Sequence, residues 1–489
     1  MSGLTPAQIG ALTAAQLAGL TANQFNALSG AQIGGLTTAD IRALSTTQIA
    51  SLSGAQIAGL SASQIGALSP AQLGSLTINY NSLLTLLQAD ATGGMTAGKF
   101  SALQALAGKL NVPGGISVPA YVQQIFDNVV LGNAANASWM GGTSHAVGLG
   151  NLNAASSQTQ AGELIGKWFL GTDLPSSSVT MSGVPNFNVY YSDVSNPLFG
   201  GGGPSMSDIN QGYLGDCFVL APLAEMANQD PSAIQSMITA NGNNTYSVRF
   251  TVNGKDDYVT VNNKLADGGA IFNHAANNWA GLIEKAYTQL QAGGAVTGDN
   301  FTYGNSYSSI GNGGYPDAIL EEITGAPTIT DLAANGSTWS SYSYNGPSLS
   351  VPNRPNSVIL QSSQDGLPEA TVQAMLIADL SAGDDLILSS YTDAVDNGGK
   401  TTLVADHAMA VYGFDTGTGK FQVYNPWGTY NGGGQYWDTS FEIGLPALQT
   451  AGDVISVATN ANPLPLSPAV TPLLGSPQPL ANTLGLAVA

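Results

Sequence analysis

The first 76 residues of the chain repeat with a period of eight. Each unit reads Leu, Ser or Thr, two variable residues, Gln, a large apolar residue and two mostly small residues, and Asp40 replaces the glutamine once. The units begin at Leu4, Leu12, Leu20, Leu28, Leu36, Leu44, Leu52, Leu60 and Leu68. In one continuous helix, a step of eight residues would rotate each apolar position by about 80° beyond two full turns. No single buried stripe would form, so the period argues against one long amphipathic helix.

The pattern inside each unit favours a helix that starts anew. Ser or Thr followed three residues later by Gln is the signature of a capping box, which satisfies backbone N–H groups at a helix N-terminus. We therefore predict a solenoid of very short helices and turns that stacks its Leu and Ile residues inward. The alternative is a low-complexity segment that is partly ordered at best. Binding of a protein partner, spacing and export are all open as roles, because no residue of the repeat carries chemistry.

Beyond the repeat the pattern changes several times. Residues 77–190 contain longer helical stretches such as FSALQALAGKL and YVQQIFDNVV, which indicate a helical linker domain. Residues 191–347 are predicted to combine helices with the strand pair TYSVRFTV and KDDYVTV, and residues 348–460 to be rich in strands, with DTGTGK as a hairpin turn. Residues 461–489 lack periodicity and are predicted to be a flexible tail.

Charge and hydropathy limit the partners. Eleven Lys and Arg against 31 Asp and Glu give a formal net charge of −20, and there is no basic cluster. Nucleic acids and anionic membrane surfaces are therefore poor partners, since their phosphates would be repelled. The sequence contains no run of about 18 apolar residues, so it predicts no membrane span. The N-terminal residues lack the features of a cleaved secretory signal. Localisation stays open between the bacterial cytoplasm and export without such a signal.

The single cysteine, Cys217, excludes an internal disulfide and a thiolate-rich zinc site. It lies where GYLGDCFVLAPLAEMANQ changes from a Gly-punctuated turn to a helix, and the N–H groups and dipole of a helix N-terminus favour a thiolate. His407 lies in a β segment, and Asn425 in the turn YNPWG is suited to orient its imidazole. Taken singly, a lone cysteine is more often a small buried apolar residue, and a lone strand histidine is more often structural.

Four segments, in this order, resemble the calpain family of papain-like cysteine proteases. QGYLGDCFVLAPLAEMA is similar to the cysteine motif of the family. NWAGLIEKAYTQL, from Asn278, resembles its Trp-x-x-Leu-Leu-Glu-Lys-Ala-Tyr helix, and GGYPDAILEEITG, from Gly313, resembles its Gly-Gly-x-x-x-x-Ala-x-x-x-Leu-Thr-Gly helix. DHAMAVYGFDTGTGKFQVYNPWG resembles its histidine strand, hairpin and Asn-Pro-Trp-Gly turn. The resemblance covers residues 196–445, or about half of the chain.

The resemblance implies an α+β fold with a papain-like two-lobe protease core. A helical lobe would carry the cysteine and a β-rich lobe would carry the histidine and the asparagine, with the repeat solenoid and the small helical domain ahead of them. Phe218 stands where the family usually has Trp, which is expected to change the packing only slightly. The segment TITDLAANGSTWSSYSYNGPSLSVPNRP, residues 328–355, is expected to be an insertion near the cleft between the lobes.

Carried onto this sequence, the resemblance implies an endopeptidase that hydrolyses proteins or peptides through a thioester acyl-enzyme. Cys217 is the expected nucleophile, His407 the general base and then general acid, and Asn425 the residue that orients the imidazole. Gln211, six residues before the cysteine, is expected to donate its side-chain amide to the oxyanion together with the backbone N–H of Cys217. Trp427 is expected to shield the hydrogen bond between His407 and Asn425 from water.

Three residues beside these motifs have simpler interpretations. Glu284 and Lys285 are interpreted as an ion pair on a helix surface or between the lobes. Asp216 is as well suited to cap the cysteine helix as to take part in the chemistry.

Calcium dependence stays open, and no other cofactor is assigned. The animal members of the family bind calcium through acidic loops in both lobes. The loops DGGAIFNHAANN and TDAVDNGG of this chain are rich in Gly and Asn, so the acidic positions do not map onto them and the metal ligands stay unknown. No loop has the spacing of an EF-hand.

Two other functions compete with hydrolysis. One is a catalytically silent, calpain-fold binding or structural protein that works through its repeats, although the chain keeps Gln211, Cys217, His407 and Asn425. The other is acyl transfer by a transglutaminase-like enzyme. Such enzymes usually carry Asp as the third member of the catalytic set, so Asn425 favours a protease.

Overall fold

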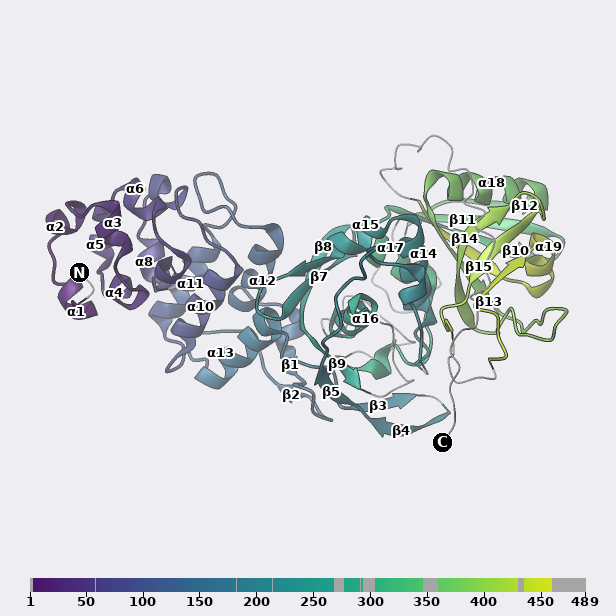
Figure 1. Cartoon of the computed structure of the whole chain (residues 1–489), viewed down its shortest axis with the longest axis horizontal. Helices are drawn as coiled ribbons and strands as arrows, with labels where there is room; N and C mark the ends of the chain where they lie inside the picture. The colour runs from purple at the N-terminus through teal and green to yellow at the C-terminus, as the bar shows by residue number, and fades with distance from the viewer. Residues whose placement is uncertain are drawn as a thin grey trace, which may run out of the picture.

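The computed structural model describes residues 3–57, 59–181, 183–212, 214–267, 277–290, 292, 304–345, 359–429 and 435–459. The described chain is elongated, with short helices at one end, a mixed helix-and-strand part in the middle and a large sheet at the other end (Figure 1). The predicted tail, residues 461–489, lies outside the described residues, and so does most of the loop DGGAIFNHAANN.

Each repeat unit forms one helix of four to six residues, as the capping pattern predicts. In the first unit, Thr5 Oγ1 accepts the Gln8 N–H and Gln8 Oε1 accepts the Thr5 N–H at 2.8 Å, which is a complete capping box. The helices are α1 (Pro6–Ile9), α2 (Ala14–Ala18), α3 (Ala22–Asn26), α4 (Gly30–Gly34), α5 (Thr38–Ala43), α6 (Thr46–Ala50), α7 (Gly54–Ile57), α8 (Ala62–Gly66) and α9 (Pro70–Leu73).

The glutamine side chains join successive coils of this solenoid. Each helix packs against the helix three units later, α1 against α4 and α2 against α5, so about three units make one coil. Gln56 Nε2 donates to the carbonyls of Phe25 and Leu28, both at 3.0 Å, while Gln56 Oε1 accepts the Ser53 N–H at 2.9 Å. Gln32, Gln48, Gln64 and Gln72 make the same kind of bond to carbonyls 28 to 31 positions earlier. A glutamate would cap the helix but has no N–H to give, which explains the preference for an amide.

Small residues at the ends of the units let the coils approach closely. A Cβ atom added to Gly59 would lie 2.1 Å from the Gly30 carbonyl oxygen, and one added to Gly35 would lie 2.4 Å from the Pro6 carbonyl oxygen. Both contacts are far inside van der Waals distance, so a larger residue at either position would push two coils apart.

Replacing Gln56 with glutamate is expected to destabilise the repeat by about 1–3 kcal/mol. The carboxylate would keep the capping box but would face the two carbonyls of the previous coil without a proton to donate, at a side chain that is 2% exposed. Chemical denaturation followed by circular dichroism measures the loss. Gln16→Glu is the matched control, because Gln16 caps its helix in the same way but is exposed. Equal losses of stability in both variants would contradict the inference that the buried glutamine side chains join successive coils.

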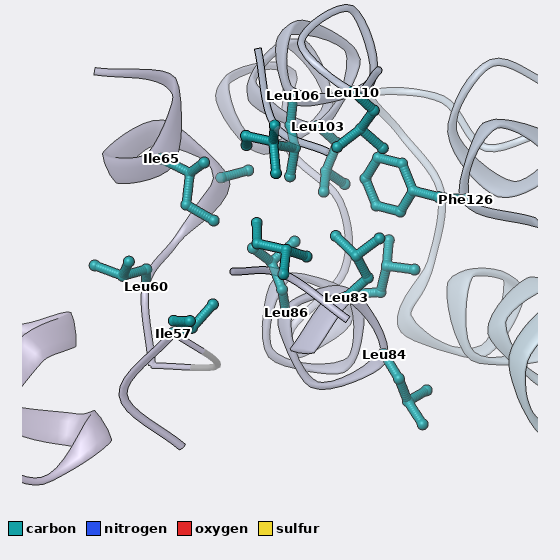
Figure 2. Packing of buried hydrophobic residues seen from close by; sticks show 14 of the residues in the cluster. Ile57, Leu60, Ile65, Leu83, Leu84, Leu86, Leu103, Leu106, Leu110 and Phe126 are labelled. Carbon is teal, nitrogen blue, oxygen red and sulfur yellow. The ribbon is translucent and has the colours of Figure 1, made fainter. Parts of the chain in front are cut away.

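The solenoid shares one hydrophobic core with the helices that follow it. These are α10 (Tyr80–Ala91), α11 (Ala97–Ala107), α12 (Ala120–Val130), α13 (Gln158–Ile165) and the π-helical turn η2 (Gly166–Leu170). Figure 2 shows Ile57, Leu60 and Ile65 of the repeat on one side of this core, opposite Leu83, Leu86, Leu103 and Leu106. The buried cluster runs without a break from Ile9 to Phe169. The predicted division at residue 76 therefore does not separate two cores, and we propose one N-terminal unit of residues 3–170.

A second core surrounds the cysteine helix. Its helices are α14 (Cys217–Gln229), α15 (Pro231–Met237), α16 (Trp279–Leu290) and α17 (Pro316–Thr324), and its antiparallel strands are β6 (Ile238–Ala240), β7 (Thr245–Val252) and β8 (Lys255–Asn262). The predicted strand pair and the helix from Trp279 are confirmed. Smaller pairs are β1 (Ser138–Trp139) with β2 (Val147–Gly148), β3 (Ser178–Met181) with β4 (Val184–Asn188), and β5 (Tyr190–Asp193) with β9 (Lys264–Asp267).

The histidine lies in an antiparallel sheet, of which the described residues form eight strands. Their order across the sheet is β12 (Ile359–Leu367), β11 (Thr338–Asn345), β10 (Thr328–Asn335), β17 (Val454–Thr459), β13 (Asp385–Ser390), β14 (His407–Asp415), β15 (Lys420–Tyr424) and β16 (Ser440–Ile443). The predicted hairpin at DTGTGK joins β14 to β15. Helices α18 (Glu369–Ala382) and α19 (Leu445–Ala451) pack on this lobe.

One sequence-based expectation about this lobe is wrong. The segment expected to be an insertion near the cleft begins with β10 and β11, which pair with each other, and β10 also pairs with β17 in the middle of the sheet. The predicted division at 347/348 would therefore cut a continuous sheet. We propose instead that the second lobe begins between the end of α17 and Thr328.

The N-terminal unit attaches to the cysteine lobe. Helix α12 and the turn η2 pack on β8, and Gln124 Nε2 donates to Asp257 Oδ1 at 2.8 Å. Asn81 Nδ2 donates to the Asn241 carbonyl at 3.4 Å. Within the described ranges, no helix combines the length and the apolar character needed to cross a membrane.

Candidate active site

Helix α14 begins at Cys217, as the sequence pattern predicts. The turn before it is tightly packed: Gly215 N donates to the Gly311 carbonyl at 3.0 Å, and a Cβ on Gly215 would lie 2.7 Å from that oxygen. Glycine is therefore required at this position. The thiol at the helix start is 7% exposed and faces the apolar contact between the two lobes, with Ala408 and Ile387 in the same cluster.

His407 and Asn425 come from neighbouring strands of the sheet. His407 is the first residue of β14, and Asn425 follows the last residue of β15 and is fully buried. His407 Nε2 and Asn425 Oδ1 lie 2.9 Å apart. Asn425 Oδ1 also accepts the Trp427 N–H at 3.0 Å, which identifies this atom as the oxygen of the amide. Nε2 is therefore the protonated nitrogen of the neutral imidazole, and Nδ1 is left to accept a proton.

One tryptophan packs on the histidine, and a second packs on the first. The ring of Trp427 packs on the imidazole of His407 with 4.9 Å between the ring centroids, and Trp427 and Trp437 form a T-shaped pair with 5.5 Å between their centroids. Trp437 Nε1 donates to the Gly428 carbonyl at 2.9 Å, which holds the second ring in place. The position of Trp427 is suited to shield the bond between His407 and Asn425, as the sequence analysis expects of it.

Gln211 is tied to both lobes. Its Nε2 donates to the Leu214 carbonyl at 2.6 Å, and its backbone N–H donates to the Pro426 carbonyl at 2.8 Å. Because a side-chain amide carries two hydrogens on Nε2, one of them remains for another acceptor. The second bond links the loop before the cysteine to the turn that holds Asn425.

Four of the five expected site residues meet at one cavity of about 630 Å³ between the lobes: Gln211, Cys217, His407 and Trp427 line it. Asn425 is absent from this lining because it lies behind the imidazole. Sequence reasoning did not single out Tyr436 and Trp437, which line the same cavity. The only signal for them is a pair of aromatic residues shortly after the Asn-Pro-Trp-Gly turn.

The local environment favours the neutral forms of both reactive groups. Burial raises the pKa of the Cys217 thiol to about 12; a hydrogen bond from the Ala408 backbone opposes this shift and the charge of Asp216 adds to it. Burial lowers the pKa of His407 to about 4, and the hydrogen bond with Asn425 partly offsets this shift. Transfer of the thiol proton to Nδ1 would form a thiolate and an imidazolium without changing the net charge of the pair.

The interpretation of Glu284 and Lys285 as a surface or inter-lobe ion pair is wrong. Both side chains are buried in α16. Lys285 Nζ donates to the Asn262 carbonyl at 3.1 Å, to Asn262 Oδ1 at 2.7 Å and to the Lys264 carbonyl at 2.7 Å. The ammonium therefore braces the end of β8 and the start of β9. Burial lowers its pKa well below the usual value for lysine, with the charge of Lys264 as a smaller cause.

Among the described residues, no group of three or more His, Cys, Asp or Glu side chains gathers in a way that could hold a metal ion. In the loop TDAVDNGG, Asp393 accepts the Ala405 N–H and Asp396 accepts the Gly398 and Lys400 N–H groups. These carboxylate oxygens accept backbone N–H groups of their own and the following segment, and calcium dependence stays open.

Comparison with known proteins places the site in context. The family model for calpain family cysteine proteases matches residues 191–443, and the model for the ALTTAQ repeat matches residues 1–38 and 33–70. The catalytic subunit of calpain-2 from Bos taurus is 33% identical over 118 residues, which are 21% of this chain and 17% of that protein. Calpain clp-4 from Caenorhabditis elegans is 31% identical over 150 residues, 28% of this chain and 18% of that protein. The calpain-type cysteine protease DEK1 from Arabidopsis thaliana is 27% identical over 163 residues, 30% of this chain and 7% of that protein. The chain thus spans less than a fifth of the length of each of these relatives.

Proposed function

The chain belongs to the calpain family of cysteine proteases, and on this premise we propose that it hydrolyses peptide bonds of proteins through a thioester acyl-enzyme. The observation that carries the proposal is the meeting of Cys217, His407 and Gln211 at one cavity, with Asn425 behind the imidazole. A nucleophile, a base with a defined tautomer and an amide donor are the three elements that this chemistry needs.

The proposed reaction uses His407 as both base and acid, Cys217 as the nucleophile and Gln211 as a donor to the oxyanion. His407 Nδ1 takes the proton of Cys217 as the sulfur attacks the carbonyl carbon of the substrate. The oxyanion accepts the free N–H of Gln211 Nε2 and the backbone N–H of Cys217. The tetrahedral species collapses as His407 returns its proton to the leaving amine, which leaves a thioester on Cys217. His407 then activates a water molecule that hydrolyses the thioester and regenerates the thiol.

The cavity walls suggest which substrates fit. Trp427, Tyr436 and Trp437 form an aromatic wall beside His407, and Asp406 is the one carboxylate among the described residues that line the cavity. Because His407 protonates the leaving amine, this wall faces the leaving half of the substrate. We propose that it favours an aromatic or long aliphatic residue immediately after the cleaved bond, and that the net charge of −20 disfavours acidic segments.

Cleavage of an unfolded protein tests the proposal. Purified full-length chain is incubated with reduced casein, and the new N-termini are identified by mass spectrometry. We expect cleavage with apolar residues at the new N-termini, and one-to-one labelling of Cys217 by a thiol-reactive epoxide. Labelling without cleavage would favour acyl transfer, for which incorporation of a primary amine is the readout. Absence of both cleavage and labelling would favour the catalytically silent protein.

The acid limb of kcat/KM is expected near pH 4. The reaction needs an imidazole that can accept a proton, and burial holds the pKa of His407 at about 4. Activity is therefore present above that pH and falls about tenfold per pH unit below it, whereas an unshifted histidine would lose activity below about pH 6.5. A pH profile with a fluorogenic peptide, with circular dichroism at each pH to confirm folding, measures the limb. A midpoint near pH 6.5 in the folded protein would contradict this assignment.

We propose that the N-terminal unit recruits a protein partner and does not restrain the cleft. No described residue of 3–170 lines the described cavity, and the contacts of this unit with the cysteine lobe include β8, the first residue of β7 and the loop before it. The surface of the repeat is mostly polar and uncharged, which suits specific contacts with a folded protein better than electrostatic ones.

Deleting residues 5–28 is expected to leave kcat unchanged and to weaken partner capture. The deletion removes three units and joins Leu4 to Ser29, which keeps the eight-residue period. Because each coil contacts only its neighbours, the next coil becomes the first coil of the shortened solenoid, and the coils after it keep their contacts. Peptide cleavage kinetics and pull-down from the source cells measure the two effects. A raised kcat would indicate that the repeat restrains the active site.

A further inference from the structure

The first coil of the solenoid, formed by α1, α2 and α3, has an exposed end face. Figure 1 shows this coil at the end of the chain opposite the large sheet. Its three capping glutamines, Gln8, Gln16 and Gln24, are exposed. In the later units the same position is buried: Gln32 is 5% exposed, Asp40 7%, Gln48 3%, Gln56 2%, Gln64 4% and Gln72 4%. The difference arises because each later unit lies against the coil before it.

The exposed face presents hydrogen-bond donors. A buried glutamine such as Gln56 uses its Oε1 for the capping box and its Nε2 for carbonyls of the previous coil. Gln8, Gln16 and Gln24 use Oε1 in the same way, and each accepts the N–H of the Thr three residues earlier at 2.8 to 3.0 Å. Within the described part of the chain, no carbonyl accepts the hydrogens of their Nε2 atoms. These amides are therefore available to acceptors on another surface.

The same face keeps the small residues that interior coils use for close contact. The eighth residue of a unit approaches the unit one coil earlier, as Gly35 approaches Pro6. The first coil also has small, exposed residues at this position: Ala11, Gly19 and Ala27. The leucines that open its three units are only partly buried: Leu4, Leu12 and Leu20. A solenoid end adapted to solvent usually has a distinct polar repeat, whereas this end has the sequence of an interior coil.

The other end of the solenoid is covered by the helices that follow it. Helix α11 packs on α8, and α10 packs on α7. Lys109 Nζ donates to the carbonyl of Gly66, the seventh residue of its unit, at 2.7 Å. In the interior, Gln72 Nε2 donates to the carbonyl of Arg42, also the seventh residue of its unit, at 3.3 Å. The lysine thus provides the donor that a following glutamine provides between coils.

We propose that the exposed face of the first coil binds a coil of the same octapeptide repeat carried by a second protein. This inference deepens the proposed recruitment of a protein partner and rests on it. The partner coil presents its carbonyls to Gln8, Gln16 and Gln24 and stacks as the coils of this chain stack on one another. Two copies of this chain do not fit. Two first coils would oppose donors to donors, and the other end of the solenoid is already covered.

Binding of a synthetic repeat peptide tests the proposal. The probe is a fluorescein-labelled peptide of residues 4–53, which spans two coils and lacks the helices that cover the last coil of the full chain. Glutamate replaces its own Gln8, Gln16 and Gln24, so that the peptide cannot stack on itself. It is titrated with the full-length Cys217→Ala chain, which cannot cleave it, and binding is followed by fluorescence anisotropy. We expect saturable one-to-one binding.

A triple variant of the full-length chain removes the donors of the face. Gln8→Glu, Gln16→Glu and Gln24→Glu together should weaken peptide binding by about tenfold or more, because three N–H donors are lost. The repeat should still fold, since the carboxylate of Asp40 forms a complete capping box at this position. Asn23→Asp is the control for added charge and should leave the affinity unchanged. It changes the fourth position of a unit, which is exposed in interior coils too, at Ala31, Ala39 and Thr47.

A duplicated coil provides a second measurement that does not require the peptide to fold alone. Residues 4–27 are inserted ahead of Leu4, which keeps the eight-residue period. Limited thermolysin digestion, read by intact mass, shows whether the added coil is folded. It should resist digestion on the unmodified face and be removed rapidly from the triple variant.

Binding by either route that the triple variant weakens supports the proposal. The proposal is overturned if neither the peptide, at millimolar concentration, nor the added coil binds. It is also overturned if the triple variant weakens neither, or if the Cys217→Ala chain alone associates through this face in sedimentation experiments. Peptide cleavage kinetics test the protease assignment separately, because every binding measurement uses a chain without the nucleophile or reads only the added coil.

Discussion

Replacing Cys217 with alanine is expected to lower kcat for protein cleavage by about four orders of magnitude or more. The methyl group cannot form a thioester, and no other described residue that lines the cavity has a comparable nucleophile. The fold should persist, because the thiol lies in a small apolar cluster with Ala221, Ala408 and Ala458, which accommodates a methyl group. Initial rates of casein cleavage, with the thermal midpoint as the check on folding, measure the effect.

Cys217→Ser is the matched control for this result. The hydroxyl keeps nearly the shape of the thiol but is a much weaker nucleophile at its ordinary pKa. Both variants should be inactive, and neither should react with a thiol-reactive epoxide. Cleavage at an unchanged rate in either variant would show that Cys217 is not the nucleophile and would contradict the proposed function.

Replacing Trp279 with alanine is expected to destabilise the protein by about 3–5 kcal/mol. The indole is fully buried in the core of the cysteine lobe, so the substitution leaves a large cavity. Its Nε1 also donates to Asp208 Oδ2 at 2.8 Å. Asp208 ends the turn η3 (Met206–Asp208), three residues before Gln211. Loss of the indole should therefore loosen the loop that presents the oxyanion donor as well as the core.

Trp279→Phe separates the two contributions. It keeps most of the apolar volume and removes the N–H, so we expect a loss of about 1–3 kcal/mol from the buried carboxylate that loses a donor. Urea denaturation followed by far-UV circular dichroism ranks the variants, and peptide cleavage measures the displacement of Gln211. If Trp279→Ala unfolded at the same urea concentration as the unmodified protein, the indole would not be part of the core.

Much of the repeat could be predicted because its signals are local. Capping needs only residues three apart, and each unit carries its own Ser or Thr and its own Gln, so the short helices follow from the sequence. The second use of the glutamine could not be foreseen. The bonds from Gln56 to Phe25 and Leu28 depend on how many units make one coil, which is a property of packing.

The residues proposed for the site follow from a different kind of signal. Cys217, His407 and Asn425 lie far apart in sequence, and spacing alone does not connect them; the ordered family motifs suggest their association. No motif in the sequence indicates the domain boundaries or the burial of Glu284 and Lys285. From sequence, β10 and β11 resemble an insertion, because their pairing with the rest of the sheet is visible only in the folded protein. Lys285 likewise resembles a surface residue, because its acceptors Asn262 and Lys264 are brought to it by folding.

The period of the repeat, the start of α14 at Cys217 and the identity of the residues proposed for catalysis follow from the amino-acid sequence, because each depends on neighbours within one turn or one motif. Tertiary packing is what gives the solenoid a core in common with the helices after it, and what bonds Gln211 to the turn that holds Asn425. These contacts join residues from separate elements. Burial between the two lobes then raises the pKa of Cys217 and lowers the pKa of His407.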